Sequence, residues 1–188
     1  MGSVRPVILK SETSEGFELG TRRIGRTSSL SLTLFNTDYD DFIESLVLIG
    51  VDPDTGDLIF QSQNIDRARI YGLDIRYEQD LSAWHERMRG WLLNLAGYWA
   101  KGKNLQTDRP LNSIAPPQGV LGLSWVSADG RWDVAANGTF TASKDVNDID
   151  QTDGERFATP SWGILDLTAG WRFGDRLDLR AGVSVSLT

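Results

Sequence analysis

The last stretch of the chain alternates strictly between hydrophobic and polar residues. From 165 to 173 the odd positions are apolar and the even positions are polar or glycine, and the alternation resumes from 177 to 188. A period of two places one strand face against an apolar medium and the other against a polar one. The short, turn-rich link 173–176 joins the runs into an antiparallel hairpin. Alternation over this length is typical of a transmembrane β-barrel.

The same pattern predicts six further strands upstream. They cover residues 12–24, 28–43, 58–78, 90–101, 119–126 and 132–143. Three prolines keep 102–118 out of central strands, and 51–57 is an evident turn within a long connection. Short and long connections alternate, as the two rims of an outer-membrane barrel require. We predict an all-β, antiparallel, up-and-down transmembrane β-barrel of about eight strands, with residues 1–188 as a single domain.

Composition narrows the class of protein. The formal net charge is −7, so there is no basic excess and we expect no nucleic-acid partner. The chain has no Cys and one His, His85, so disulfides, thiolate metal sites and multi-His centres are excluded. There is no nucleophile-elbow motif and no evident catalytic partner for His85, so we expect no enzyme. No run approaches the roughly 18 apolar residues of a membrane helix.

Polar residues at inward-facing strand positions form the first candidate site. They are Asp74, Arg76, Asn94, Asp133, Asn137, Asp166, Arg172, Asp178 and Arg180. An eight-stranded barrel has an interior just wide enough for side chains. Unpaired buried charges are costly, so we expect these lumen-facing residues to pair as a polar core rather than to line a pore.

Aromatic residues near strand ends form a second set. They are Tyr77, Trp91, Trp99, Trp125, Trp132, Trp171 and Phe173. Aromatic rings concentrate at both membrane–water interfaces. We therefore predict two interfacial girdles, although packing inside a soluble barrel would account for some of these residues.

Candidate metal and ligand residues are few. A haem-ligand role is one interpretation of His85, but a lone surface His is favoured because one His is not a site. Two acidic clusters, 38–44 and 145–155, carry enough carboxylates for calcium, but the spacing of a calcium loop is absent. We therefore predict solvated loop charge and no metal site. Tyr39, Phe42, Gln61 and Gln63 lie where strands pass into long loops.

Several stretches resemble the C-terminal part of the barrel of TonB-dependent outer-membrane receptors, of the haem and haemoglobin type. They are EGFELG (15–20), LTLFNTDYDDFI (32–43), QNIDRARIYGLD (63–74), GYWAKGKN (97–104), PLNSIAPP (110–117) and LDLRAGV (177–183). The resemblance implies a bacterial outer-membrane location and haem or another ferric chelate as the cargo of the parent receptor. It also implies a lipid bilayer or detergent as surroundings, and a TonB complex as partner of the full receptor only. In that receptor, the region of Tyr39, Phe42, Gln61 and Gln63 would contribute to ligand capture.

The chain also departs from that family. Transporters of this kind have about 22 strands and a plugged lumen, whereas here there is room for about eight and no plug or TonB-contacting box. The aromatic C-terminal residue of the family is replaced by Thr188, and both termini are expected at the long-loop rim. We expect a truncated or engineered piece of a receptor that does not transport alone. The alternative is an autonomous or engineered small barrel with a structural role, and whether it closes is left open.

Overall fold

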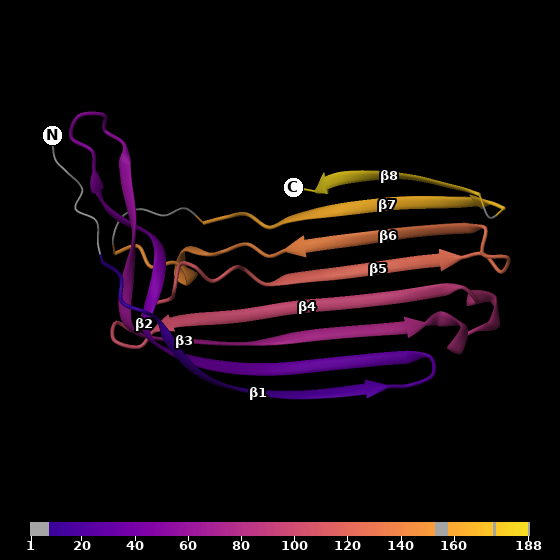
Figure 1. Cartoon of the computed structure of the whole chain (residues 1–188), viewed down its shortest axis with the longest axis horizontal. Helices are drawn as coiled ribbons and strands as arrows, with labels where there is room; N and C mark the ends of the chain where they lie inside the picture. Colours follow the sequence, from indigo (N-terminus) through magenta and orange to yellow (C-terminus); the bar gives the residue numbers. More distant parts are fainter. Residues whose placement is uncertain (1–7, 153–157, 175, 188) are drawn as a thin grey trace.

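The computed structural model describes residues 8–152, 158–174 and 176–187. These residues form one eight-stranded antiparallel sheet in which every strand pairs with its neighbours in sequence, in the order β1 to β8. Figure 1 shows the strands running side by side along the long axis of the molecule. The all-β, up-and-down architecture predicted from the alternation is confirmed.

The strand bounds lie close to the predicted ones over most of the chain. They are β1 Thr13–Ile24, β2 Ser28–Val51, β3 Leu58–Asp80, β4 Trp91–Asn104, β5 Gln118–Val126, β6 Trp132–Thr141, β7 Trp162–Phe173 and β8 Leu177–Leu187. Short 3₁₀ turns occupy the links after β3 (η1 Leu81–Ala83 and η2 Glu86–Met88) and after β6 (η3 Val146–Asp148).

Connections of different length lie at opposite ends of the sheet. The links 25–27, 81–90 and 127–131 lie together at one end with the described part of the β7–β8 link, residues 174 and 176, and we call this end the short-turn rim. The β2–β3 hairpin, the loop 105–117 and the described parts of the loop 142–161, residues 142–152 and 158–161, lie at the other end, the long-loop rim. The predicted alternation of connections is therefore confirmed.

The β2–β3 hairpin is longer than the pattern predicts. Residues 44–51, expected within a connection, continue β2 as far as Val51, so that β2 has 24 residues and β3 has 23. A barrel strand needs about 9–11 residues to cross a bilayer. More than half of this hairpin therefore projects beyond the apolar part of the sheet, and it stands across the strand ends in Figure 1.

The sheet is not closed. Among the described residues, β1 pairs only with β2, and β8 pairs only with β7. Every residue of β1 and β8 is exposed. The expectation of a sealed polar core inside a small barrel is thus wrong for this structure, because the first and last strands do not meet to enclose it.

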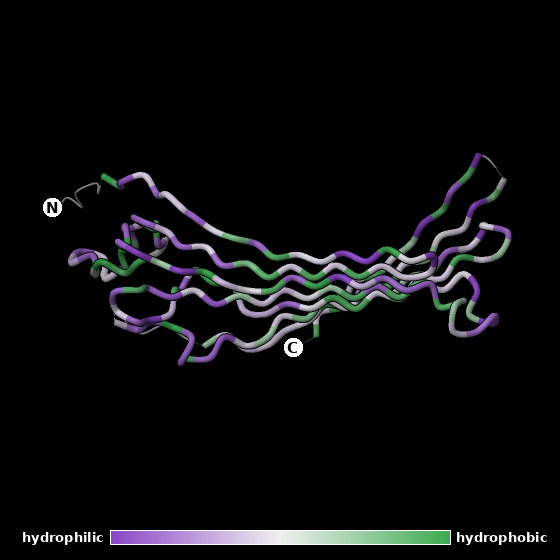
Figure 2. The backbone as a smooth tube through the Cα atoms, turned by 90° about the horizontal axis from the view of Figure 1, so that it is seen from below, coloured by the Kyte–Doolittle hydropathy of each residue, from purple (hydrophilic) through white to green (hydrophobic). Residues whose placement is uncertain are grey.

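Alternating side chains account for the strands themselves. Figure 2 shows hydrophobic and hydrophilic residues following one another along the middle of the sheet. β-Branched residues such as Val183 and Val185 favour the extended conformation of a pleated surface. At the β5–β6 turn, Gly130 takes a φ of 67°, a value that suits glycine. In the part of the chain that the structure describes, no helix is long and apolar enough to cross a membrane.

Candidate functional site

Strand register separates the side chains into two chemically different faces. Asp74 and Arg76 of β3 share one face with Asn94 of β4, because the register pairs Asp74 with Tyr98 and Arg76 with Ala96. The same register, continued through β6, β7 and β8, brings every predicted lumen-facing residue onto this face, which we call the polar face. The seven predicted girdle aromatics all lie on the opposite, apolar face.

Charged residues of the polar face pair with one another across strands. A guanidinium nitrogen of Arg180 lies 3.5 Å from a carboxylate oxygen of Asp133, two strands away, and Arg172 pairs with Asp178 at 3.6 Å. Gly170 lies between Arg180 and Asp133, where a Cβ atom would collide with the Asp133 carboxylate. The absence of a side chain at this position lets β6 and β8 interact over β7. These pairs are solvent-exposed, so each contributes at most about 1 kcal/mol.

Aromatic contacts mark both ends of the apolar face. At the short-turn rim, Trp91 lies 6.4 Å from Trp125, and Trp132 stacks on Trp171 at 5.7 Å between ring centroids. At the other end, Trp99 meets Tyr71 edge to face at 5.9 Å. Trp91 and Trp99 are eight residues apart on β4, or about 26 Å along a strand. That length, reduced by strand tilt, suits the ~25 Å apolar band of outer-membrane barrels. Tyr71 was not predicted, although its strand alternation was recognised.

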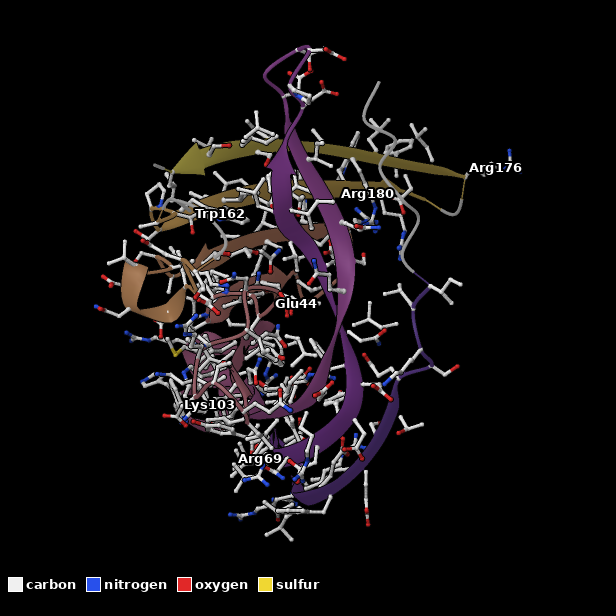
Figure 3. All side chains as sticks on the ribbon, turned by 90° about the vertical axis from the view of Figure 1, so that its left-hand side faces the viewer. Glu44, Arg69, Lys103, Trp162, Arg176 and Arg180 are labelled. Atoms are coloured by element: carbon white, nitrogen blue, oxygen red, sulfur yellow. The ribbon has the colours of Figure 1, made fainter. Side chains whose placement is uncertain are left out.

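The long loops are joined by a buried carboxylate. Glu44 of β2 is 5% exposed, and its carboxylate accepts hydrogen bonds from the backbone N–H of Ser113 at 2.8 Å and from its hydroxyl at 3.0 Å. Figure 3 looks onto the long-loop rim and shows Glu44 on the hairpin that crosses in front of the strand ends. Because Glu44 and Ser113 are 69 residues apart, this contact docks the hairpin on the loop 105–117.

A second set of contacts joins the loop 105–117 to the loop 142–161. The side chain of Asn112 donates to the carbonyl of Asp150 at 3.0 Å and accepts from its backbone N–H at 2.8 Å. The ammonium of Lys144 donates to the carbonyls of Asn112 and Ile114 at 2.8 and 2.6 Å. Three segments of the long-loop rim therefore hold one another in place.

A small apolar cluster lies beneath these contacts. Phe42, Ala68 and Leu111 are its buried members, with Ala68 completely inaccessible, and the ring of Tyr39 meets Phe42 edge to face at 5.3 Å. Phe42 can reach this cluster because Asp41 takes a φ of 54°, a left-handed value. Tyr39 and Phe42 both contact this cluster although they are three residues apart along β2, which strict alternation would not allow.

An open pocket lies between the docked segments. Its volume is about 220 Å³, and Gln63, Asn104, Arg109 and Asp150 are among the residues that line it. Ligand sites for drug-sized molecules have volumes of about 300–1,000 Å³. This pocket alone is therefore smaller than the usual site of a drug-sized molecule. Of the loop-proximal residues predicted from sequence, Gln63 lines the pocket, whereas Tyr39 and Phe42 stabilise the loops.

Exposed apolar residues extend towards the hairpin tip. Ile49, Val51, Leu58 and Phe60 are 39–57% exposed, and none of them was predicted as a site residue. The tip itself is ordered by Asp52, whose carboxylate accepts from the backbone N–H of Asp54 at 2.8 Å. The hairpin thus presents apolar surface beyond the loop cluster.

The first acidic cluster is divided among separate partners. Asp38 pairs with Arg69 through two hydrogen bonds of 2.5 and 2.8 Å, Asp40 faces Arg67, and Asp41 faces Lys10. The Asp38–Arg69 pair lies beyond the apolar band. The hydrogen bond from Arg69 is the main cause that lowers the pKa of the Asp38 carboxyl below its ordinary value. These carboxylates point to different cations and do not converge on one point.

The second acidic cluster and His85 also have local partners. Asp145 accepts from the N–H of Asn147, Asp148 lies 3.7 Å from Lys101, and Asp150 lies 3.5 Å from Arg109. The remaining members, Asp153 and Glu155, lie outside the described residues. His85 is exposed at the short-turn rim, where its Nδ1 accepts from the backbone N–H of Arg87 at 3.1 Å. Among described residues, no group of three His, Cys, Asp or Glu side chains is placed to hold a metal.

Comparisons with known proteins agree with this geometry. A family model described as TonB dependent receptor-like, beta-barrel matches residues 3–184. Hemoglobin-haptoglobin utilization protein B of Neisseria meningitidis serogroup C is 27% identical over 199 residues, covering 92% of this chain and 24% of that protein. Ferric enterobactin receptor PirA of Pseudomonas aeruginosa is 29% identical over 195 residues, covering 94% of this chain and 24% of the relative.

Solved structures show the same strand arrangement. The copper transporter OprC superposes with a TM-score of 0.77 at 21% identity, over 94% of this chain and 26% of its own. The FrpB iron transporter from Neisseria meningitidis superposes with a TM-score of 0.67 at 14% identity, over 93% and 26% of the two chains. The chain thus spans about a quarter of these two proteins and of the two curated relatives named above. With a family match over nearly its whole length, the chain belongs to the TonB-dependent receptor β-barrels, which are outer-membrane proteins of Gram-negative bacteria.

Proposed function

We propose that the chain forms part of the barrel wall of an outer-membrane receptor for uptake of haem or another iron chelate. The observation that carries the proposal is the family match over residues 3–184, on a sheet with one polar and one apolar face. Two relatives are named for haemoglobin–haptoglobin utilization and for ferric enterobactin, so the cargo class is iron in chelated form.

In this proposal the polar face is the lumen wall and the apolar face contacts lipid. The nine polar residues from Asp74 to Arg180 would line the lumen, and the seven aromatics from Tyr77 to Phe173 would lie at headgroup depth. The loop cluster around Glu44 and Ser113 would face the outside of the cell. The pocket with Gln63 and Arg109 and the apolar hairpin tip would then contact cargo.

The open sheet argues against transport by these eight strands alone. Unpaired backbone groups at the edges of β1 and β8 are not tolerated in lipid. We propose that further strands pair with both edges in a barrel of about 22 strands, with residues 1–188 as one partial barrel domain. TonB coupling would belong to that whole receptor.

The alternative, an autonomous small barrel, requires β1 to pair with β8. We would first fold the chain in detergent and compare its gel mobility with and without boiling. No heat-dependent shift is expected, because the described edges are unpaired. A clear shift would mean a closed autonomous barrel and would replace the partial-wall proposal.

Cargo contact is tested by binding of haemoglobin, haemin and ferric enterobactin to the detergent-folded chain. We expect measurable binding of one of them, weakened at least fivefold by the double substitution Leu58→Ser and Phe60→Ser at the hairpin tip. Trp84→Ser, an equally exposed apolar residue at the opposite rim, is the matched control. If none of the three binds, or if the control weakens binding as much, the loops of this chain do not capture cargo.

A further inference from the structure

The basic residues differ in kind between the two ends of the sheet. The four lysines, Lys10, Lys101, Lys103 and Lys144, all belong to the long-loop end. Among Lys and Arg, the short-turn rim contains arginines alone, together with the single His85. Arginine presents a planar fork of donors that matches the geometry of a phosphate group, whereas lysine is a compact, strongly hydrated point charge. The arginines of the short-turn rim can therefore form directed hydrogen bonds with phosphate groups, in addition to attracting anions by their positive charge.

The pairing of these cations also differs. At the long-loop end each of six cations has a carboxylate within 4 Å: Lys10–Asp41, Arg67–Asp40, Arg69–Asp38, Lys101–Asp148, Lys103–Asp108 and Arg109–Asp150. At the short-turn rim, Arg131 and Arg172 have carboxylates at 3.7 and 3.6 Å, but Arg23, Arg26, Arg87 and Arg89 are exposed and none of these four has a carboxylate within 4 Å among the described residues. We call these four residues the arginine rim.

The arginine rim comes from neighbouring turns. Arg23 and Arg26 flank the β1–β2 turn, and Arg87 and Arg89 lie in the β3–β4 link. The two segments touch where the N–H of Asp80 donates to the carbonyl of Thr27 at 2.8 Å. Farther along the same end, Arg176 projects away from the β7–β8 turn in Figure 3.

The depth of the arginine rim relative to a bilayer follows from its aromatic neighbours. Arg89 precedes Trp91 by two residues, or about 7 Å along an extended chain. Trp84, in the same link, is 62% exposed. Since Trp rings lie at the level of the headgroups, the guanidinium groups would lie at the depth of the lipid phosphates in the proposed membrane placement.

Acidic groups nearby do not neutralise this surface. Glu78, Asp80 and Glu86 belong to the same strand end and link, and Arg22 adds a further positive charge. The Asp80 carboxylate already accepts from the N–H of Ser82 at 2.9 Å. Five arginines thus face three carboxylates, and the surface keeps a net positive charge although the whole chain has −7.

We propose that the arginine rim is a binding site for the phosphate headgroups of anionic phospholipids in the leaflet at the short-turn rim. Charge complementarity and bidentate guanidinium–phosphate hydrogen bonds supply the interaction, and Trp84 anchors the link in the interface. The site is separate from cargo capture, which takes place at the opposite end. It rests only on the membrane placement of the apolar face.

Tryptophan fluorescence reports on this rim directly. Of the seven tryptophans, Trp84, Trp91, Trp125, Trp132 and Trp171 lie at the short-turn end. The chain is folded in mixed micelles of detergent and phosphatidylcholine, which do not require its two sheet edges to be paired, and quenching by brominated phosphatidylglycerol is compared with quenching by brominated phosphatidylcholine. Each arginine near an anionic surface gives about a fivefold preference at low salt. We expect at least a tenfold preference for phosphatidylglycerol overall.

Two matched variants distinguish lipid binding at the arginine rim from an effect of the protein's net charge. The rim variant carries Arg23→Gln, Arg26→Gln, Arg87→Gln and Arg89→Gln, and its preference is expected to fall below about twofold. The control variant carries Arg67→Gln, Arg69→Gln, Lys101→Gln and Lys103→Gln, which removes the same charge from paired cations at the other end. It is expected to keep the preference. Equal loss in both variants would show a net-charge effect and would overturn the proposal.

Two further measurements on the unaltered chain test the proposal if the rim variant does not fold. On the unaltered chain, 0.5 M NaCl must abolish the preference, whereas inorganic phosphate at an ionic strength matched with chloride must not displace the lipid. Displacement by phosphate would mean a site for the free anion. Absence of any preference in the unaltered chain would leave an acidic protein as the better partner and would refute lipid binding.

Discussion

Glu44 offers the most direct test of how the long-loop rim is held together. In Glu44→Ala the backbone N–H and hydroxyl of Ser113 lose a charged acceptor at 2.8 and 3.0 Å in a site where Glu44 is only 5% exposed. A hydrogen bond to a charged group contributes about 1.5–3 kcal/mol. If each of the two bonds contributes the lower value, the substitution lowers the free energy of undocking the hairpin by about 3 kcal/mol. That corresponds to about a hundredfold rise in the open population.

Amide hydrogen exchange measures this opening segment by segment. Peptides covering 42–65 and 105–117 should exchange about a hundredfold faster in Glu44→Ala, whereas peptides from β6 to β8 should not change. Asp41→Asn is the control in the same hairpin. Its ion pair with Lys10 is exposed and contributes at most about 1 kcal/mol, and Asn tolerates the left-handed φ. An acceleration below threefold in Glu44→Ala, or one spread evenly over the sheet, would refute the docking role of Glu44.

Three further perturbations test the faces of the sheet and one of its turns. Val183→Arg on the apolar face should destabilise the protein in mixed micelles of detergent and phospholipid by about 2–4 kcal/mol in urea titrations, whereas Ser184→Arg on the polar face should cost far less; equal shifts would contradict the assignment of faces. Gly72→Ala places a Cβ against a backbone carbonyl of β4 and an aromatic ring of β2, and overpacking of this kind costs about 1–3 kcal/mol, so an unchanged urea midpoint would argue against that close contact. The Ser127 hydroxyl is the main cause that lowers the pKa of Asp129. Ionised Asp129 therefore stabilises this turn at pH values above the unfolded carboxyl pKa of about 4. That stabilisation is lost as the pH falls through the lowered pKa of the folded state. Ser127→Ala should raise the pKa of Asp129, and an NMR titration measures it.

Local alternation was enough to predict most of the sheet. Alternation of apolar and polar residues depends only on neighbouring positions in the sequence. It therefore predicted the bounds of β5 to β8 within a few residues and assigned Asp133, Arg180 and Trp171 to their faces of the sheet. The family also emerged from residues spread along the chain, and the family match confirms it.

The long-loop rim was harder to predict because its order comes from distant residues. Alternation is interrupted at the left-handed Asp41, because Tyr39 and Phe42 both contact the same apolar cluster, and register shifts follow at Glu44/Val47 and Leu48/Gly50 although the strand continues. Glu44 finds its partner 69 residues away. The open sheet also could not be predicted from the pattern, because the presence or absence of pairing between β1 and β8 leaves no local signal in either strand.

The break in alternation at Asp41 divides one continuous hairpin into two parts. Towards the sheet, pairing with β1 and β4 fixes the side-chain order as far as Asp40 of β2 and Ala68 of β3. Beyond Asp41, contacts with the long loops hold a different order. Insertions or deletions at the hairpin tip would therefore change the outer part without altering strand pairing in the sheet below it. In this way the length of the hairpin can change independently of the eight-stranded sheet.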